Sequence, residues 1–310
     1  MIKSPITGND SVIIHEFNVK DIVSLYKNDF QLDVSGFFEG LDTFSLCECK
    51  DTAFKFYYPF NLAGDSRFYE ELSKDNKFYY PSWKWENQKA LELIKSKFSV
   101  AEEFSLLDIG CGEGFFLKAI NEEFSNVNLV GLEHNEVAVK KMNSEGIFAM
   151  NQYIEQHAVV KPAEYDFIFA FQVLEHVQNV NTFLDACIKA LKPGGILFFG
   201  VPNNDSFIFR NDLYHVLNLP PHHMGLWGNK SLRNLALIFD LKVLDIAEQP
   251  ADKNNLGIYF KVWLKKYLPG CQRLFYPLFR IPVKFFLRIF TPKRGHTITV
   301  SYEKSMLKMK

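Results

Sequence analysis

The sequence predicts an open, mostly parallel α/β sheet with helices on both faces, preceded by a small N-terminal region. From residue 104 onward, short apolar runs alternate with segments of helical periodicity. Several runs are apolar at nearly every position, which is typical of parallel strands buried on both faces. A glycine-rich turn follows the first of these runs, and open α/β sheets bind their ligands at such turns.

Each predicted element of this region depends on a short apolar run or on helical spacing of apolar residues. Strands are expected at residues 104–109, 127–132, 147–150, 166–171, 196–201, 241–246 and 297–302. Helices are expected at residues 86–98, 115–124, 136–142, 183–191 and 231–239. The Lys-Pro-Gly-Gly segment at 192–195 is expected to end the fourth helix, and Pro202 to end the strand that follows it.

The N-terminal region has a different pattern. Short strands joined by turns are predicted at three apolar runs separated by Gly, Asn and Asp, at residues 11–17, 44–49 and 54–58. The change to the alternating pattern falls between Leu72 and Phe78. We therefore expect a small N-terminal domain at residues 1–75 and a larger domain at residues 76–310.

The composition of the chain excludes several classes of protein. The chain has 310 residues, of which 47% are hydrophobic, and a net charge of -1, so no affinity for nucleic acid is expected. Its five cysteines are odd in number and irregularly spaced, which argues against a disulfide framework. We find no secretory leader and no long uncharged apolar run, so a cytoplasmic protein is expected.

The strongest local signal is the glycine loop Asp108-Ile109-Gly110-Cys111-Gly112-Glu113-Gly114. Glycines allow a tight turn and let a ligand lie against bare main chain. The spacing differs from the G-x-G-x-x-G pattern of nicotinamide dinucleotide sites. Asp108 would repel a pyrophosphate, but its carboxylate suits a ligand with a cationic amino group. A nicotinamide oxidoreductase is therefore disfavoured.

This loop resembles motif I of the class I S-adenosylmethionine-dependent methyltransferases, D-x-G-x-G-x-G. The match is complete at Asp108, Gly110, Gly112 and Gly114. The resemblance implies a Rossmann-like, doubly wound, seven-stranded sheet that is parallel except for its last strand. It also implies that these four residues bind S-adenosylmethionine as cofactor.

A carboxylate follows the next predicted strand. Glu133 lies 25 residues after Asp108, where an acidic residue can accept hydrogen bonds from both ribose hydroxyls of a nucleoside ligand. By itself Glu133 would be interpreted as a solvated turn residue. Its position downstream of the glycine loop favours cofactor binding instead.

Residues 166–177, DFIFAFQVLEHV, resemble the fourth strand of the family and the loop that follows it. The resemblance places Phe171 and Gln172 beside the methionine part of the cofactor, and His176 near the site of methyl transfer. His176 is a candidate general base because its unperturbed pKa is near neutrality. The alternative is that Glu175 and His176 only organise the loop.

A second pair of histidines lies in residues 220–227, PPHHMGLW, which resemble a loop that faces the acceptor in related methyltransferases. His222 and His223 follow two prolines, which restrict the backbone. Both are candidates for deprotonating or orienting a hydroxyl group. The alternative is a histidine pair bonded to the backbone. Metal binding is disfavoured because neighbouring histidines rarely share one ion, and no metal is expected.

The N-terminal region resembles small domains on sugar-modifying methyltransferases that begin with a zinc-binding C-P-x-C-G pattern. Both cysteine positions are replaced in Ser4-Pro5-Ile6-Thr7-Gly8, so we expect a degenerate, zinc-ribbon-like domain without metal. The resemblance favours a sugar hydroxyl of a cell-surface glycan or its lipid-linked precursor as acceptor. The alternatives are a lipophilic small molecule such as a quinone precursor, and a non-catalytic scaffold, which the intact motif disfavours.

Residues 252–294 form an insertion before the last predicted strand. Its part from 256 to 294 holds nine basic residues, no acidic residue and many aromatic residues. This composition predicts peripheral contact with an anionic membrane at the inner face of the cell membrane. Pro269, Pro277 and Pro282 argue against spanning. A lid or a dimer contact is the alternative, and RNA binding would also suit the charge.

Overall fold

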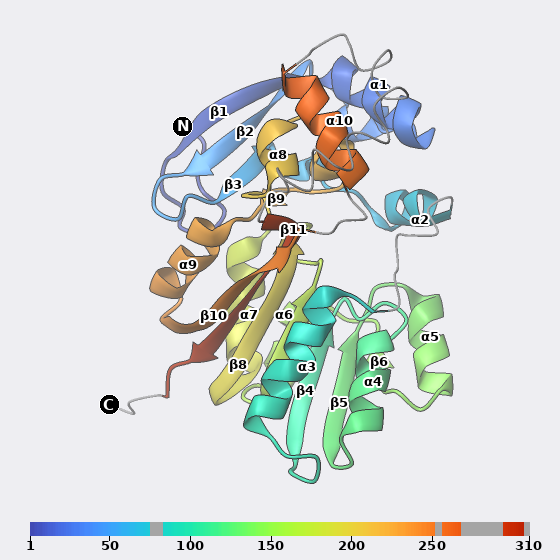
Figure 1. Ribbon diagram of the computed structural model, residues 1–310, viewed down its shortest axis with the longest axis vertical. Coiled ribbons are helices and arrows are strands. Elements are labelled where there is room, and N and C mark those ends of the chain that lie inside the picture. The colour runs from blue at the N-terminus through green and yellow to red at the C-terminus, as the bar shows by residue number, and fades with distance from the viewer. Residues whose placement is uncertain (75–82, 252–255, 268–293, 307–310) are drawn as a thin grey trace.

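The computed structural model describes residues 1–74, 83–251, 256–267 and 294–306 (Figure 1). Its larger sheet has seven strands in the order β10-β11-β8-β7-β4-β5-β6, and β11 runs antiparallel to both of its neighbours. The strands are β4 (Phe104–Ile109), β5 (Val127–Leu132), β6 (Ala149–Met150), β7 (Tyr165–Phe171), β8 (Leu191–Pro202), β10 (Leu241–Pro250) and β11 (Arg294–Lys304). The predicted doubly wound sheet, parallel except for its last strand, is confirmed.

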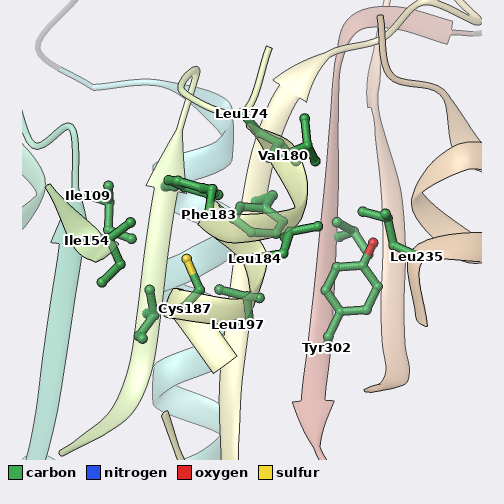
Figure 2. Packing of buried hydrophobic residues seen from close by; sticks show 14 of the residues in the cluster. Ile109, Ile154, Leu174, Val180, Phe183, Leu184, Cys187, Leu197, Leu235 and Tyr302 are labelled. Atoms are coloured by element: carbon green, nitrogen blue, oxygen red, sulfur yellow. The ribbon is translucent and has the colours of Figure 1, made fainter. Parts of the chain in front are cut away.

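Helices of the described residues cover both faces of this sheet (Figure 1). One face carries α3 (Trp85–Lys97), α4 (Phe115–Glu123) and α5 (Glu136–Ser144). The other carries α6 (Ile154–Val160), α7 (Val180–Ala190) and α9 (Asn229–Ile238). Figure 2 shows the second core, where Leu184 of α7 lies beside Leu197 of β8, and Leu235 of α9 lies beside Tyr302 of β11.

The alternation of side chains along each strand explains why the strands are apolar throughout. In β7, Phe167 and Phe169 face the core under α3 and α4, whereas Ile168 and Ala170 face the core under α6 and α7. Successive residues of a strand point to opposite faces. Because both faces are covered, both sets must be apolar, and all four residues are buried.

A second, antiparallel sheet has the order β1-β2-β3-β9. It contains β1 (Ser11–Asn18), β2 (Thr43–Cys49), β3 (Lys55–Tyr58) and β9 (Gly225–Leu226), with α1 (Val19–Phe30) and α2 (Ser66–Lys74) beside it. The strand β9 comes from the segment between β8 and α9. Trp227, which follows β9, stacks on Phe54 with 4.0 Å between ring centroids. The N-terminal sheet therefore includes a piece of the later chain.

Several elements differ from the sequence prediction. Helices α1, α2 and α6 were not predicted, nor were α8 (Phe207–Asn211) and α10 (Leu256–Tyr267). Strand β8 begins at Leu191. The segment at 192–195 therefore follows helix α7 but already belongs to the strand. The strand expected at 147–150 has only two residues, because the backbone N–H of Ile147 donates to the carbonyl of Met142 and completes the end of α5.

Most of the predicted insertion at 252–294 lies outside the described residues. The described part is α10 (Leu256–Tyr267), which packs on α8 (Phe207–Asn211). Tyr259 and Phe260 of α10 are buried with Ile208 of α8. Lys265 pairs with Asp212, and the Lys266 ammonium donates to Asn211 at 2.6 Å. Part of this basic, aromatic segment thus packs against another helix of the same chain.

Within the described ranges, none of the helices has both the length and the hydrophobicity that crossing a membrane requires.

The stability of the seven-stranded sheet is expected to depend on the close packing of its two hydrophobic cores. Substitution of Leu197 tests this expectation. Leu197 is fully buried in β8, so Leu197→Ala should lower the free energy of unfolding by about 2–5 kcal/mol through lost burial and a cavity. The matched control is Leu237→Ala on α9, where the leucine is 81% exposed and the change should be within about 0.5 kcal/mol. Urea denaturation measures both, and equal losses would contradict the assignment of this core.

Candidate active site

The glycine loop turns the chain from β4 into α4 at the carboxyl end of the sheet. Gly110, Gly112 and Gly114 all have positive φ angles, of 70°, 56° and 72°. A Cβ on Gly110 would lie 2.5 Å from a methyl group of Val173, and one on Gly114 would lie 2.6 Å from the sulfur of Met142. A Cβ on Gly112 would meet no atom within 4 Å. Gly110 and Gly114 therefore serve close packing, whereas Gly112 borders open space.

Glu133 holds this loop from the next strand. The backbone N–H of Gly112 donates to Glu133 Oε2 at 2.8 Å, and the N–H of Asn135 donates to Oε1 at 2.9 Å. Each carboxylate oxygen has a further lone pair, so Glu133 can also accept from a ligand hydroxyl. The carboxylate predicted for ribose binding thus lies directly beside the glycine loop.

Asp108 is the buried acidic residue at the start of the glycine loop. It is 2% exposed, and its Oδ1 has no hydrogen-bond partner among the residues that the structure describes. Burial raises the pKa of Asp108 well above its usual value, and the charge of Glu133 raises it further. A cationic group bound here would supply the missing partner. The residues therefore fit S-adenosylmethionine, which carries a cationic amino group.

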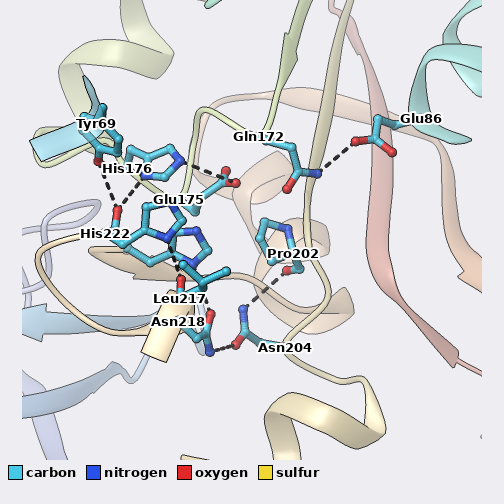
Figure 3. A network of polar contacts seen from close by, with 11 residues as sticks. Tyr69, Glu86, Gln172, Glu175, His176, Pro202, Asn204, Leu217, Asn218 and His222 are labelled. Atoms are coloured by element: carbon cyan, nitrogen blue, oxygen red, sulfur yellow. Dashed lines mark hydrogen bonds and ion pairs between the residues drawn. The ribbon is translucent and has the colours of Figure 1, made fainter. Parts of the chain in front are cut away.

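The other two predicted cofactor residues have different environments. Phe171 ends β7 and packs edge-on against Phe116, with 4.9 Å between ring centroids. Gln172 has a φ of 56°, and its side-chain amide donates to Glu86 at 3.1 Å (Figure 3). Glu86 is 3% exposed, and burial raises its pKa. The sequence did not single out Glu86, because a glutamate in the first turn of a helix is ordinary.

The three predicted histidines come together. His176 follows β7, and the ring centroids of His222 and His223 lie 5.0 Å and 4.9 Å from its own. The loop that carries His222 and His223 is fixed to the turn after β7, since the N–H groups of Met224 and Gly225 both donate to the carbonyl of Glu175. The two predicted histidine motifs thus form one cluster (Figure 3).

Backbone carbonyls determine the tautomers of two of these rings. Nδ1 of His176 lies 2.6 Å from the carbonyl oxygen of His222. Nδ1 of His222 lies 2.7 Å from the carbonyl oxygen of Leu217. A carbonyl oxygen can only accept, so in both rings Nδ1 carries the hydrogen. Nε2 of each neutral ring therefore carries the lone pair.

A chain of amides, of which Asn204 and Asn218 are seen in Figure 3, determines the tautomer of His223 in the same way. The carbonyl of Pro202 accepts from the amide nitrogen of Asn204, so the Asn204 oxygen faces Asn218 and accepts from it at 2.8 Å. The Asn218 oxygen consequently faces His223, 3.2 Å from its Nδ1. His223 must donate to that oxygen, and its Nε2 carries the lone pair as well.

Burial keeps the cluster uncharged. It lowers the pKa of His176 to about 4 and that of His222 to about 3, where the neighbouring His176 adds to the effect. Burial and then His222 lower the pKa of His223 well below its usual value. All three rings are neutral near pH 7, and each can accept a proton or an electrophile at Nε2.

Two further residues of the cluster were not predicted as contacts. Tyr69 of α2 places its hydroxyl 3.1 Å from both the His222 carbonyl and Nδ1 of His176. Glu175 is 1% exposed, and burial raises its pKa to about 8. The helix that carries Tyr69 escaped prediction, and the burial of Glu175 depends on long-range packing.

One positive charge links the glycine loop with the histidine cluster. Lys84 precedes α3, and its charge lowers the pKa of Asp108, Glu175 and His176. Lys84 is therefore within electrostatic range of all three groups. The glycine loop and the histidine cluster also meet through Val173, which packs on Gly110 and whose carbonyl accepts from the N–H of His176.

A family profile described as a methyltransferase domain matches residues 73–246, more than half of the chain. A ubiquinone biosynthesis O-methyltransferase of Hydrogenovibrio crunogenus is 30% identical over 191 residues, covering 58% of this chain and 76% of that protein. A protein of the same name from Idiomarina loihiensis is 34% identical over 104 residues, covering 32% of this chain and 43% of that protein. The chain thus spans less than half the length of this second relative.

Among solved structures, a SAM-dependent methyltransferase from Archaeoglobus fulgidus aligns with a TM-score of 0.49 and 15% identity over 77% of this chain and 100% of that chain. Coclaurine N-methyltransferase bound to N-methylheliamine and SAH aligns with a TM-score of 0.46 and 16% identity over 70% of each chain. The sheet order and the family profile agree with each other. The chain therefore belongs to the class I S-adenosylmethionine-dependent methyltransferases and is an enzyme with S-adenosylmethionine as its cofactor.

Proposed function

We propose that this enzyme is an O-methyltransferase in which His176, His222 or His223 removes the proton of a hydroxyl acceptor. The observation that carries the proposal is the fixed tautomer of all three rings, which leaves the lone pair on Nε2. S-adenosylmethionine supplies the methyl group from its sulfonium. The acceptor oxygen gains the methyl group, and its proton goes to the imidazole.

The cofactor is held in this proposal by the residues that the sequence motifs indicated. Asp108 pairs with the cationic amino group, and Gly112 lets the ligand approach the main chain. Glu133 accepts from the ribose hydroxyls while it holds the loop. The remaining cofactor residues line the site or shape it, and they are Gly110, Gly114, Phe171 and Gln172.

The low basicity of the cluster favours a phenolic acceptor. A base with a pKa of about 3 or 4 removes a proton more readily from a phenol, which ionises near pH 10, than from the far less acidic hydroxyl of a sugar. The curated relatives named ubiquinone biosynthesis O-methyltransferases support the same acceptor class. We therefore place the quinone-precursor alternative before the sugar hydroxyl, which stays a prediction.

The division into domains also stays a proposal. In it, residues 1–75 form the small domain, and the methyltransferase domain carries the insertion. The zinc-ribbon-like character of the small domain and the membrane contact through residues 256–294 are proposals of the same kind. Membrane contact would depend on the basic residues other than Lys265 and Lys266, which α8 and the residue after it engage, and Arg294, which pairs with Glu248.

Gly112→Ala should abolish most cofactor binding, because its Cβ projects into the open space beside the loop. The matched control is Gly146→Ala, at a glycine that also has a positive φ and no atom within 4 Å of the added carbon. Both variants should lose about 1 kcal/mol of stability from the backbone strain. Calorimetry with S-adenosylmethionine separates them, and equal affinities would remove Gly112 from the cofactor site.

Asp108→Asn should raise the melting temperature of the ligand-free protein and weaken cofactor binding. The substitution removes a buried carboxylate that lacks a partner, and it also removes the charge proposed to hold the amino group. The control is Glu113→Gln, at an exposed acidic residue of the same loop paired with Lys141. A variant that binds S-adenosylmethionine as well as wild type would show that Asp108 does not contact the ligand.

The acceptor class is tested by offering a lipophilic catechol and a free sugar separately with S-adenosylmethionine. Mass spectrometry should find the methyl ether of the catechol only. Single alanine substitutions of His222 and His223 should lower turnover unequally, with His176 as the reserve base. Methylation of the sugar alone would reverse the order of the two acceptors.

The pH dependence of the same assay tests the base. A base acts when unprotonated, so lowered pKa values predict full turnover down to about pH 5, with loss only below it. A histidine with an ordinary pKa would lose half its activity near pH 6.5. Folding must be followed by circular dichroism at each pH, because neutral buried histidines favour unfolding in acid. Half-loss near pH 6.5 in a folded protein would contradict the buried cluster as base.

A further inference from the structure

The histidine cluster has the composition and geometry of a cation site. One ligand atom from each of His176, His222 and His223 can be chosen so that all three lie within 4.8 Å of one another. His222 and His223 are buried, and His176 is half-buried. Their three Nδ1–H groups donate to the oxygens described above, which is how ligating histidines are usually held from behind. A cation would be bound through Nε2.

The adjacent position of His222 and His223, which counted against a metal in the sequence, does not separate the rings in space. The two rings are stacked, with 4.3 Å between centroids and 21° between planes. The two ring planes are therefore nearly parallel, and the His176 ring meets them edge-on. Consecutive histidines fail to share an ion when their side chains point apart, whereas these two rings contact each other.

A carboxylate beside the rings gives independent support. Both oxygens of Glu175 are buried and have no hydrogen-bond partner within the described part of the chain. Glu175 Oε1 lies 3.9 Å from Nε2 of His176, beyond hydrogen-bond distance (Figure 3). Lys84 acts on Glu175 through its charge but forms no ion pair with it in the described structure. A buried carboxylate in this state is costly unless a cation or a proton accompanies it.

We propose that His176, His222, His223 and Glu175 form a binding site for a divalent transition-metal ion, with zinc as the ion that suits the site best. Three imidazole nitrogens and one carboxylate oxygen match the ligands and the coordination number that zinc prefers. Zinc–nitrogen bonds of about 2.0–2.1 Å require ligand atoms about 3.3 Å apart in a tetrahedron. The rings and the Glu175 side chain would close on the ion by small rotations.

The site has a consequence for the chemistry of the enzyme. A divalent cation at the cluster would attract an acceptor hydroxyl and lower its pKa, and it would engage the same lone pairs that otherwise act as bases. The inference depends on contacts within the cluster and not on the acceptor proposed above. A bound ion would replace the histidine base of the proposed function, whereas O-methylation itself can stand or fail with or without the ion.

The first test uses the whole purified chain. It is stripped with a chelator, incubated with zinc chloride, passed through a desalting column and analysed for metal. We expect one zinc ion per chain. Loading with Co²⁺ in place of zinc should give the visible absorption of a tetrahedral ion without a thiolate charge-transfer band. A chain that retains no zinc and shows no Co²⁺ spectrum would overturn the proposal, and so would a thiolate band, since it would place the ion at the cysteines.

Variants then locate the ion. His176→Gln and His223→Gln should weaken zinc binding by about 100-fold, and Glu175→Gln by about 10-fold, while His15→Gln in β1 leaves it unchanged. Calorimetry with S-adenosylmethionine checks that each variant is folded. Equal zinc affinity in wild type and all cluster variants would overturn the assignment. If a variant does not fold, the Co²⁺ spectrum of the wild type decides, because it reports the ligand type without any substitution.

Discussion

The parallel pairing of β4 with β5 and β7 is the constraint on which the site depends. Asp108 lies opposite Gly131 in β5 and Phe169 in β7, so these three strands end at the same edge. A Cβ at Gly131 would lie 2.6 Å from the sulfur of Cys111, so the glycine leaves room for the loop after β4 to fold over β5. This fold-back brings the N–H of Gly112 to Glu133. Strand register thus assembles the cofactor loop.

The histidine cluster depends on the second sheet. Tyr26 and Tyr57 of the N-terminal region donate to the carbonyls of Leu219 and Asn218, in the turn that precedes the two histidines. Strand β9 then pairs with β3, which fixes the chain after them. The N-terminal region therefore contributes to the site by holding a loop of the methyltransferase domain, in addition to providing Tyr69. The sheet is a structural support of the cluster.

The sequence could predict those features that depend on residues close together in the chain. The glycine loop after Asp108 and the apolar run of β7 each span only a few residues. The structure has both the turn and the strand where they were expected. Helix α1 was missed although its buried residues Val19, Ile22 and Tyr26 recur at the spacing of a helical face. The tautomer of His223 could not be predicted either, because it is set through amides that meet only in the folded chain.

The same distinction explains what the sequence could not show about two residues that it did name. Asp108 and Glu175 are buried carboxylates without donors for at least one oxygen, and burial raises the pKa of both. Folding gains nothing from such groups, since each loses its hydration without a compensating bond. Their cost is offset by the filled cores on both faces of the sheet. The unpaired carboxylates at the carboxyl edge therefore favour the binding of cations. A ligand that brings positive charge to Asp108 or Glu175 recovers the free energy that was lost when folding buried these groups.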